Sequence, residues 1–275
     1  MKHEHLGQEP YYGACVYGQS KLLFRGPRRS LKASYTAFVG STETFGRMVE
    51  TPFPALVEQA TGHRALNLGC MNAGIDAFLH DPQILTLCRA ADQVVLQVMD
   101  AANMSNRFYR VHPRRNDRFL RPSSVLEALY PETDFSEICF TWHLLEVLHA
   151  TCRTRFEAVR EELQCAWRAR IQTLLDRLET PPHLLSLTAP APERAEAASG
   201  LPKQRPLFVT SAMVEALRPR VRDIVTVEVA PEPVDHLLAL AGAPPPRLGG
   251  ASLPGPTGHE QIARALALAL ESAPR

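Results

Sequence analysis

Three short apolar segments, each followed by a polar turn and separated by helical patterns, most constrain the fold of this chain. Strand-forming runs occupy residues 35–39, 64–69 and 92–99, and helical patterns fill residues 52–62 and 81–91 between them. Strands that alternate with helices build a parallel sheet, because each helix carries the chain back across the sheet before the next strand begins. We therefore predict an α/β fold with a parallel, doubly wound sheet.

The second half of the chain extends the same pattern. Apolar residues recur at helical spacing from Phe156 to Leu178 and mark one buried stripe of a long helix. Residues 183–188 and 222–230 read as a fourth and a fifth strand, the latter rich in β-branched residues. Residues 259–272 form a terminal amphipathic helix. The sequence thus predicts a mostly parallel five-stranded sheet.

We expect one α/β domain over residues 34–275, preceded by an irregular arm over residues 1–33. Two long insertions interrupt the domain, a polar loop at 100–122 and a Pro/Ala-rich excursion at 189–206. A loop as long as the first is usually functional.

Composition excludes several classes of function. A formal net charge of +1 lacks the basic excess of a nucleic-acid-binding protein. The six cysteines contain no CxxC pair, so we expect no metal, no cofactor and no disulfide framework. No run of apolar residues is long enough to span a membrane, and the N-terminus has no apolar signal core. We therefore expect a cytoplasmic protein.

The turn after the first strand, residues 40–46 (GSTETFG), carries the first candidate chemistry. It presents the hydroxyls of Ser41, Thr42 and Thr44 and the carboxylate of Glu43. A hydroxyl early in a chain and a histidine late, here His259, is the pattern of a nucleophile and its base. The turn lacks the Lys and Ser/Thr of a phosphate-binding loop. Alternatively, its hydroxyls only cap a helix and His259 only begins one.

Two further polar turns follow the second and third strands, in residues 69–74 and 100–106. Because parallel strands end at one edge of a sheet, all three turns should line one crevice. Gly69, Asn72, Asn103 and Asn106 are the candidates in these turns, and simple turn formation is the alternative for each.

The order and spacing of these motifs resemble the SGNH (GDSL-type) hydrolase superfamily over most of the chain. The stretches KLLFRGPRR, NLGCMNAGIDAFLHDP and NMSNRFYRVHPRRNDRFLR are similar to a bacterial domain family related to that superfamily. The resemblance implies a flavodoxin-like three-layer α/β/α fold.

The resemblance also implies roles for individual residues. Thr42 falls at the position of the nucleophilic serine and Ser41 at that of the preceding aspartate, while His259 matches the general base. The Gly69 N–H and the Asn103 side chain match donors to an oxyanion, and Ser41 is the third oxyanion candidate. The sequence departs from the pattern at Thr42 itself and at Pro256, where an aspartate would orient the histidine.

An arginine-rich stretch, residues 107–121, is a separate signal. It holds six arginines against one acid, with aromatic residues between them. One hypothesis is an anion clamp, since guanidinium groups suit phosphate, sulfate and carboxylate. The alternatives are a solvated loop, arginines paired with acids on the long helix, or stacking on RNA. The candidate substrate-binding residues in and around these turns are Glu43, Asn72, Asn106, Arg107, Arg110, Arg114 and Arg115.

The resemblance favours an esterase or acyltransferase with a Thr42/His259 dyad, acting on an acylated small substrate that is anionic or linked to a carbohydrate. A non-hydrolytic descendant that binds an anionic ligand, or transfers another group, is the alternative, and a pure interaction protein is the third hypothesis. The oligomeric state stays open.

Overall fold

The computed structural model describes residues 12–190, 201, 205–233 and 252–272. Its centre is a five-stranded sheet in which neighbouring strands all run parallel. The strand order is β2-β1-β3-β6-β7, which is the flavodoxin-like order of a doubly wound sheet. The five strands are β1 (Thr36–Gly40), β2 (Ala65–Gly69), β3 (Gln93–Gln97), β6 (His183–Thr188) and β7 (Asp223–Glu228). All five strands were predicted from the sequence.

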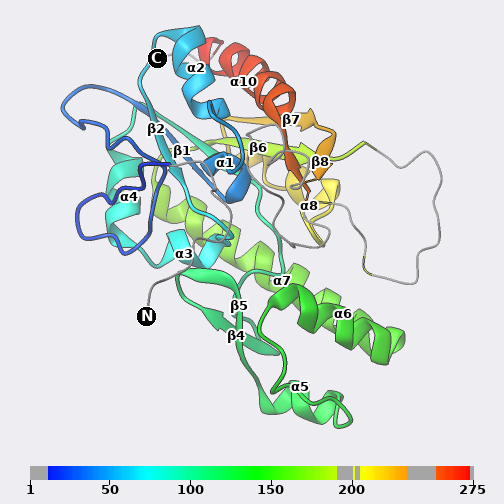
Figure 1. Ribbon diagram of the computed structural model, residues 1–275. Coiled ribbons are helices and arrows are strands. Elements are labelled where there is room, and N and C mark those ends of the chain that lie inside the picture. Colours follow the sequence, from blue (N-terminus) through cyan, green and yellow to red (C-terminus); the bar gives the residue numbers. More distant parts are fainter. Residues whose placement is uncertain (1–11, 191–200, 202–204, 234–251, 273–275) are drawn as a thin grey trace, which may run out of the picture.

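Helices cover both faces of this sheet and make three layers (Figure 1). On one face lie α2 (Phe53–Thr61) and α10 (Pro256–Glu271), and the other face carries α3 (Ile75–Leu79), α4 (Pro82–Arg89) and α7 (Arg153–Leu178). Side chains alternate between the two cores along each strand: in β1, Phe38 packs against the α2–α10 layer, whereas Ala37 and Val39 face the other. The predicted three-layer α/β/α fold is confirmed.

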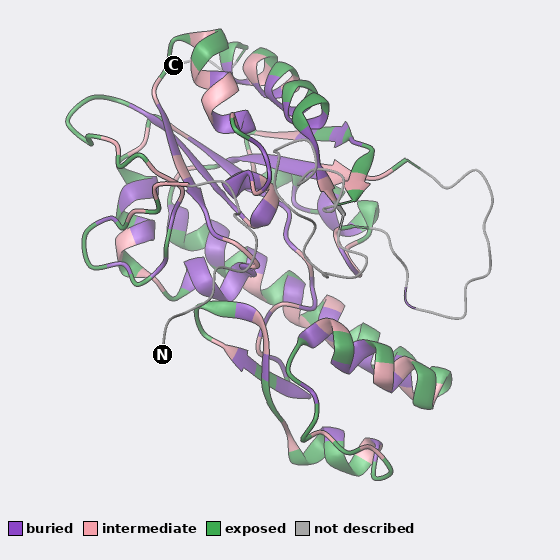
Figure 2. Cartoon of the chain, in the orientation of Figure 1, coloured by how far each residue is buried: buried purple, intermediate pink, exposed green. Residues whose placement is uncertain are grey.

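Local sequence explains the helices that were predicted. In α4 the Asp81 carboxylate caps the helix by accepting hydrogen bonds from the backbone N–H groups of Gln83 and Ile84, at 3.0 and 3.3 Å. The apolar stripe of α7 is buried along its whole length. Its members are Phe156, Val159, Leu163, Trp167, Ile171, Leu174 and Leu178. Figure 2 shows the central strands largely buried, in contrast to the outer faces of the surrounding helices.

Residues 100–122 differ from the expected structureless loop. They contain an antiparallel hairpin, β4 (Tyr109–His112) and β5 (Arg115–Pro122). The physical reason is alternation: Tyr109, Val111 and Phe119 are buried, while the arginines between them point outward. The hairpin adjoins α5 (Ser124–Leu129) and α6 (Thr141–Thr151).

The remaining elements are short. They are α1 (Thr42–Phe45), α8 (Ser211–Glu215), a 3-10 turn at Arg218–Arg220, β8 (Pro231–Pro233) and β9 (Ser252–Pro254), the last two paired antiparallel. In the described part of the N-terminal arm, residues 12–33, the Cys15–Phe24 bridge is isolated. Most of the excursion expected at 189–206 falls outside the described residues.

Neither a membrane-spanning helix nor a cluster of metal-binding side chains occurs among the described residues. No helix there has the length and apolar character needed to cross a bilayer. Nor do any three His, Cys, Asp or Glu side chains in those residues gather closely enough to hold a metal ion.

Candidate ligand site at the carboxyl edge of the sheet

The turn after β1 leads directly into α1, at the point where the strand order changes direction between β1 and β3. Gly46 ends α1 with φ 76°, a left-handed conformation that glycine adopts without strain. Ligands of open α/β sheets bind at this kind of reversal, because the two loops diverge there and leave a crevice.

Gln97, at the end of β3, holds this turn in place. Its Oε1 accepts hydrogen bonds from the Ser41 N–H at 2.9 Å and from the Thr44 hydroxyl at 2.6 Å. Its Nε2 donates to the Glu43 carboxylate at 2.8 Å. Sequence reasoning missed Gln97, although a polar residue ending a buried apolar strand was the available signal. The side chain fixes both the path of the turn and the direction of Glu43.

A small cavity of about 40 Å³ opens beside this turn. Ser41 and Glu43 line it from the β1 side, and Asn103 lines it from the loop after β3. The Asn103 Oδ1 accepts a hydrogen bond from the Thr141 hydroxyl at 2.8 Å, which leaves the amide nitrogen as the donor end of the side chain. The structure therefore brings three of the predicted site residues together.

Two charged residues that were not predicted complete the cavity wall. Arg205 forms an ion pair with Asp100 and lies over the ring of Trp142, 5.4 Å from its centroid. Burial lowers the pKa of Arg205, and the nearby Glu43 carboxylate opposes that shift. Arg205 falls in a segment that the sequence marked only as an excursion, so composition gave no signal for it.

Thr42, the predicted nucleophile, is buried and is not among the residues that line this cavity. Its hydroxyl donates to Asn72 Oδ1 at 3.2 Å and accepts from the Asn72 N–H at 2.9 Å. The Asn72 amide donates in turn to Asp117 on β5 at 3.1 Å. Burial raises the pKa of Asp117. An amide oxygen does not take up a proton at neutral pH, so this arrangement positions the Thr42 hydroxyl without activating it.

His259, the predicted base, lies in the first turn of α10 and is 1% exposed. Its Nδ1 accepts the Phe53 N–H at 3.0 Å, and its ring stacks on that of Phe53. Burial lowers the pKa of His259 to about 3, and the positive charge of Arg25 adds to this shift. The neutral ring therefore carries its proton on Nε2.

That tautomer does not suit the predicted dyad. A histidine that takes a proton from a hydroxyl needs an unprotonated ring nitrogen facing it, and a low pKa makes the ring a weak base. Among the described residues, no hydrogen bond joins Thr42 to His259. The structure does not bring these two side chains into hydrogen-bond contact.

Gly69 serves close packing at the end of β2. A Cβ atom at this position would lie 2.2 Å from the Phe45 backbone nitrogen, so only glycine lets α1 approach the strand. The Gly69 N–H already donates to Asn67 Oδ1 at 2.9 Å. It is therefore occupied, rather than free to meet an oxyanion.

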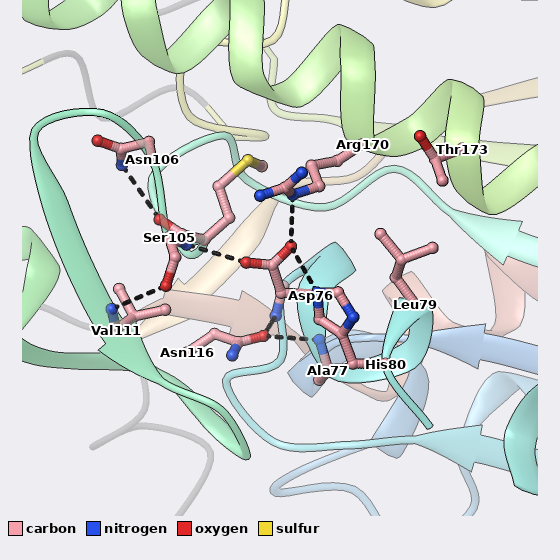
Figure 3. A network of polar contacts seen from close by, with 12 residues as sticks. Asp76, Ala77, Leu79, His80, Ser105, Asn106, Val111, Asn116, Arg170 and Thr173 are labelled. Carbon is pink, nitrogen blue, oxygen red and sulfur yellow. Dashed lines mark hydrogen bonds and ion pairs between the residues drawn. The ribbon is translucent and has the colours of Figure 1, made fainter. Parts of the chain in front are cut away.

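A buried polar network holds the loops after β2 and β3 against each other (Figure 3). The Asp76 carboxylate accepts from the Ser105 N–H at 3.0 Å and from Arg170 on α7 at 2.9 Å. Asn116 of β5 accepts from the N–H groups of Gly74 and Ala77 at 2.8 and 3.2 Å. These contacts set the positions of both loops that carry candidate site residues.

The other predicted substrate-binding residues lie away from the cavity. The Asn106 side chain forms hydrogen bonds within its own turn, where its Oδ1 accepts from the Phe108 and Tyr109 N–H groups. Arg107 pairs with Glu162 on α7, with 3.5 Å between Nε and Oε2, which was one of the alternatives for the arginine stretch. The exposed arginines at 110, 114 and 115 lie on the hairpin and do not line the cavity.

A family model described as Domain of unknown function (DUF6473) matches residues 1–273. Among solved structures, the chain is similar to the lipase Lip_vut3 from a goat rumen metagenome, at 10% identity and a TM-score of 0.40, covering 86% of this chain and 97% of that one. It is also similar to the salicylyl-acyltransferase SsfX3 from a tetracycline biosynthetic pathway, at 12% identity and a TM-score of 0.36, covering 89% and 57%. No curated protein matches.

Proposed function

We propose that this chain, which belongs to the DUF6473 family, binds a small uncharged polar ligand in the cavity at the carboxyl ends of β1 and β3. One observation carries the proposal: Ser41, Glu43 and Asn103 come from two loops that meet at the strand-order reversal and line a single cavity. Together they supply a hydroxyl, an acceptor and an amide donor, which is the mixture that fixes the orientation of a polar ligand.

The charges around the cavity favour a neutral ligand over the anionic one expected from the sequence. Among the described residues that line the cavity, Glu43 and Asp100 are acidic, and the guanidinium of Arg205 already pairs with Asp100. An anionic ligand would meet the Glu43 carboxylate, and none of these described residues supplies an unpaired cation. A neutral ligand would instead accept from Asn103 and donate to Glu43.

The proposal follows the non-hydrolytic hypothesis in its binding role but moves the ligand contacts away from the arginine stretch. It also assigns Thr42 and His259 to the framework. Thr42 joins the loops after β1 and β2 through Asn72, and His259 accepts the first N–H of α2. Both roles are consistent with deep burial.

A fragment screen by ligand-observed NMR tests the proposal. Neutral, hydroxyl- or amide-bearing fragments should bind the parent protein, and their signals should be lost with Asn103→Ala and with Glu43→Gln. Arg114→Ala, an exposed change on the hairpin, is the matched control and should leave binding intact. Fragments that bind both cavity variants as well as the parent would refute the assignment.

Ester hydrolysis or acyl transfer is the second candidate, because a hydroxyl and an amide donor share the cavity with a carboxylate. Labelling with a fluorophosphonate probe, followed by peptide mass spectrometry, shows whether Ser41 or Thr42 is the nucleophile. Labelling at Ser41 that Glu43→Gln abolishes would establish a serine enzyme at the cavity. Labelling at Thr42 that His259→Asn abolishes would restore the predicted dyad, and no labelling would leave binding as the function.

A further inference from the structure

A second, larger hollow of about 750 Å³ adjoins the cavity and shares Arg205 and Pro206 with it. Its floor is the end of β6 and β7, and its walls come from α7 and from the segment that includes α8. Because two residues line both hollows, the groove lies directly beside the small cavity.

The floor of the groove carries two hydroxyls for which the described part of the chain supplies no hydrogen-bond partner. Ser186 and Thr226 are register partners on neighbouring parallel strands, so their side chains stand side by side on one face of the sheet. Two residues earlier, Leu184 and Ile224 pack toward the α7 core, which places the hydroxyl pair on that same side. Ser186 is 5% exposed and lines the groove, and no hydrogen bond within the described residues uses its hydroxyl.

One wall of the groove is aromatic. The rings of Phe156 and Phe208 lie 5.9 Å apart, centroid to centroid. Phe208 has φ 60°, a left-handed conformation that non-glycine residues seldom adopt and that recurs at ligand-binding positions. Its carbonyl accepts a hydrogen bond from Gln164 Nε2 at 3.2 Å, which helps to hold it in this conformation.

The charged side chains of the described residues that line the groove are paired with opposite charges. Each of its three arginines forms an ion pair with an acid: Arg160 with Glu157, Arg218 with Glu215 and Arg205 with Asp100. A charged ligand would have to compete with these ion pairs, whereas a neutral ligand can accept hydrogen bonds from the guanidinium N–H groups that do not face the paired acid. Hydroxyls on the floor and rings on the wall suit a ligand with a polar edge and an apolar face.

We propose that the groove binds a neutral, polyhydroxylated ligand of the saccharide class, whose end reaches the cavity of Ser41, Glu43 and Asn103. This inference rests on the proposed function, because it treats the groove as the extension of that cavity. The ring face of the saccharide lies against Phe208, which the buried Phe156 supports from behind, and its hydroxyls meet Ser186 and Thr226.

Isothermal titration calorimetry with three neutral trisaccharides (maltotriose, cellotriose and triacetylchitotriose) tests the inference, with trigalacturonate as an acidic probe of equal length. At least one neutral probe should bind, and trigalacturonate should bind at least about tenfold more weakly. The Ser186→Ala/Thr226→Val double variant should weaken binding by about 30-fold, as two lost hydrogen bonds imply. Thr86→Val, on the exposed surface of α4, is the matched control and should change nothing.

Lack of binding by all three neutral probes, or tighter binding of trigalacturonate, would overturn the inference. Unchanged affinity in the double variant, with its thermal midpoint equal to that of the parent, would do the same. The fragment screen separates this failure from that of the proposed function. Fragments that still need Asn103 when no trisaccharide binds would leave the cavity in place and remove only the groove.

Discussion

Asn116 is the residue whose removal should most clearly expose how the site loops are held. It is fully buried on β5, and its amide makes three hydrogen bonds to the backbone of two other segments. Two of these satisfy the N–H groups of Gly74 and Ala77, and the third reaches the His112 carbonyl at 3.0 Å. Asn116→Ala removes all three at once.

The expected cost follows from these contacts. Each hydrogen bond contributes about 1 kcal/mol net, and a buried N–H left without a partner costs roughly 1–3 kcal/mol. The buried Gly74 N–H loses its hydrogen bond, whereas the Ala77 N–H keeps a second acceptor, the Gly74 carbonyl at 3.3 Å. We therefore expect Asn116→Ala to lower the free energy of unfolding by about 2–4 kcal/mol. For a chain of this size, that corresponds to a fall in Tm of about 10 °C.

Urea unfolding followed by circular dichroism measures this change. The parent and the variant are compared with one shared m-value, the slope of the free energy of unfolding against urea concentration. Arg114→Ala is the control on the same hairpin. Its side chain is exposed, so its effect should stay within about 0.5 kcal/mol. A loss below about 1 kcal/mol for Asn116→Ala would refute the reasoning, because it would mean that the buried Gly74 N–H finds another partner.

Three further predictions test other parts of the structure. Gln97→Leu should cost about 3 kcal/mol in urea unfolding, because it leaves two donors of the turn after β1 unpaired, and a cost under about 1 kcal/mol would contradict the bonding assigned to Gln97. The folded pKa of His259, about 3, lies below its unfolded value of 6.5, so its contribution to stability is complete above pH 6.5 and is lost as the pH falls toward 3. Between about pH 7 and pH 5 the free energy of unfolding should fall by about 2 kcal/mol. This fall should vanish in His259→Asn, which keeps an acceptor for the Phe53 N–H. An equal fall in both proteins would contradict the assignment. Arg107→Ala should change stability by less than about 1 kcal/mol, since the guanidinium is 61% exposed and its ion pair with Glu162 is screened by solvent; a larger loss, compared at low and high salt, would show that the pair is stronger than its exposure implies.

The sequence was sufficient for the elements whose signal is local. The five parallel strands and the buried stripe of α7 follow from the spacing of apolar residues, which does not depend on distant contacts. The hairpin was not predicted because six arginines within residues 107–121 make the segment polar overall, although Tyr109, Val111 and Phe119 alternate with polar residues. That alternation was present in the sequence and could have identified the hairpin.

The site was less accessible to sequence reasoning, because its geometry depends on which strands become neighbours. Gln97 reaches the turn after β1 only because β3 lies next to β1 in the sheet. The environment of His259 depends on Phe53, 206 positions away in the chain. Ser41, Glu43 and Asn103 could be placed at one edge, since parallel strands end together, but spacing could not distinguish the hydroxyl of Ser41, which lines the cavity, from that of Thr42.

The location of a bound ligand tests the central claim most directly. Crystals soaked with the neutral fragments that bind in solution should show density between Glu43 and Asn103, beside the Ser41 hydroxyl at the carboxyl ends of β1 and β3. Density lodged against Thr42 and His259, with the histidine ring turned away from the Phe53 N–H, would contradict the account.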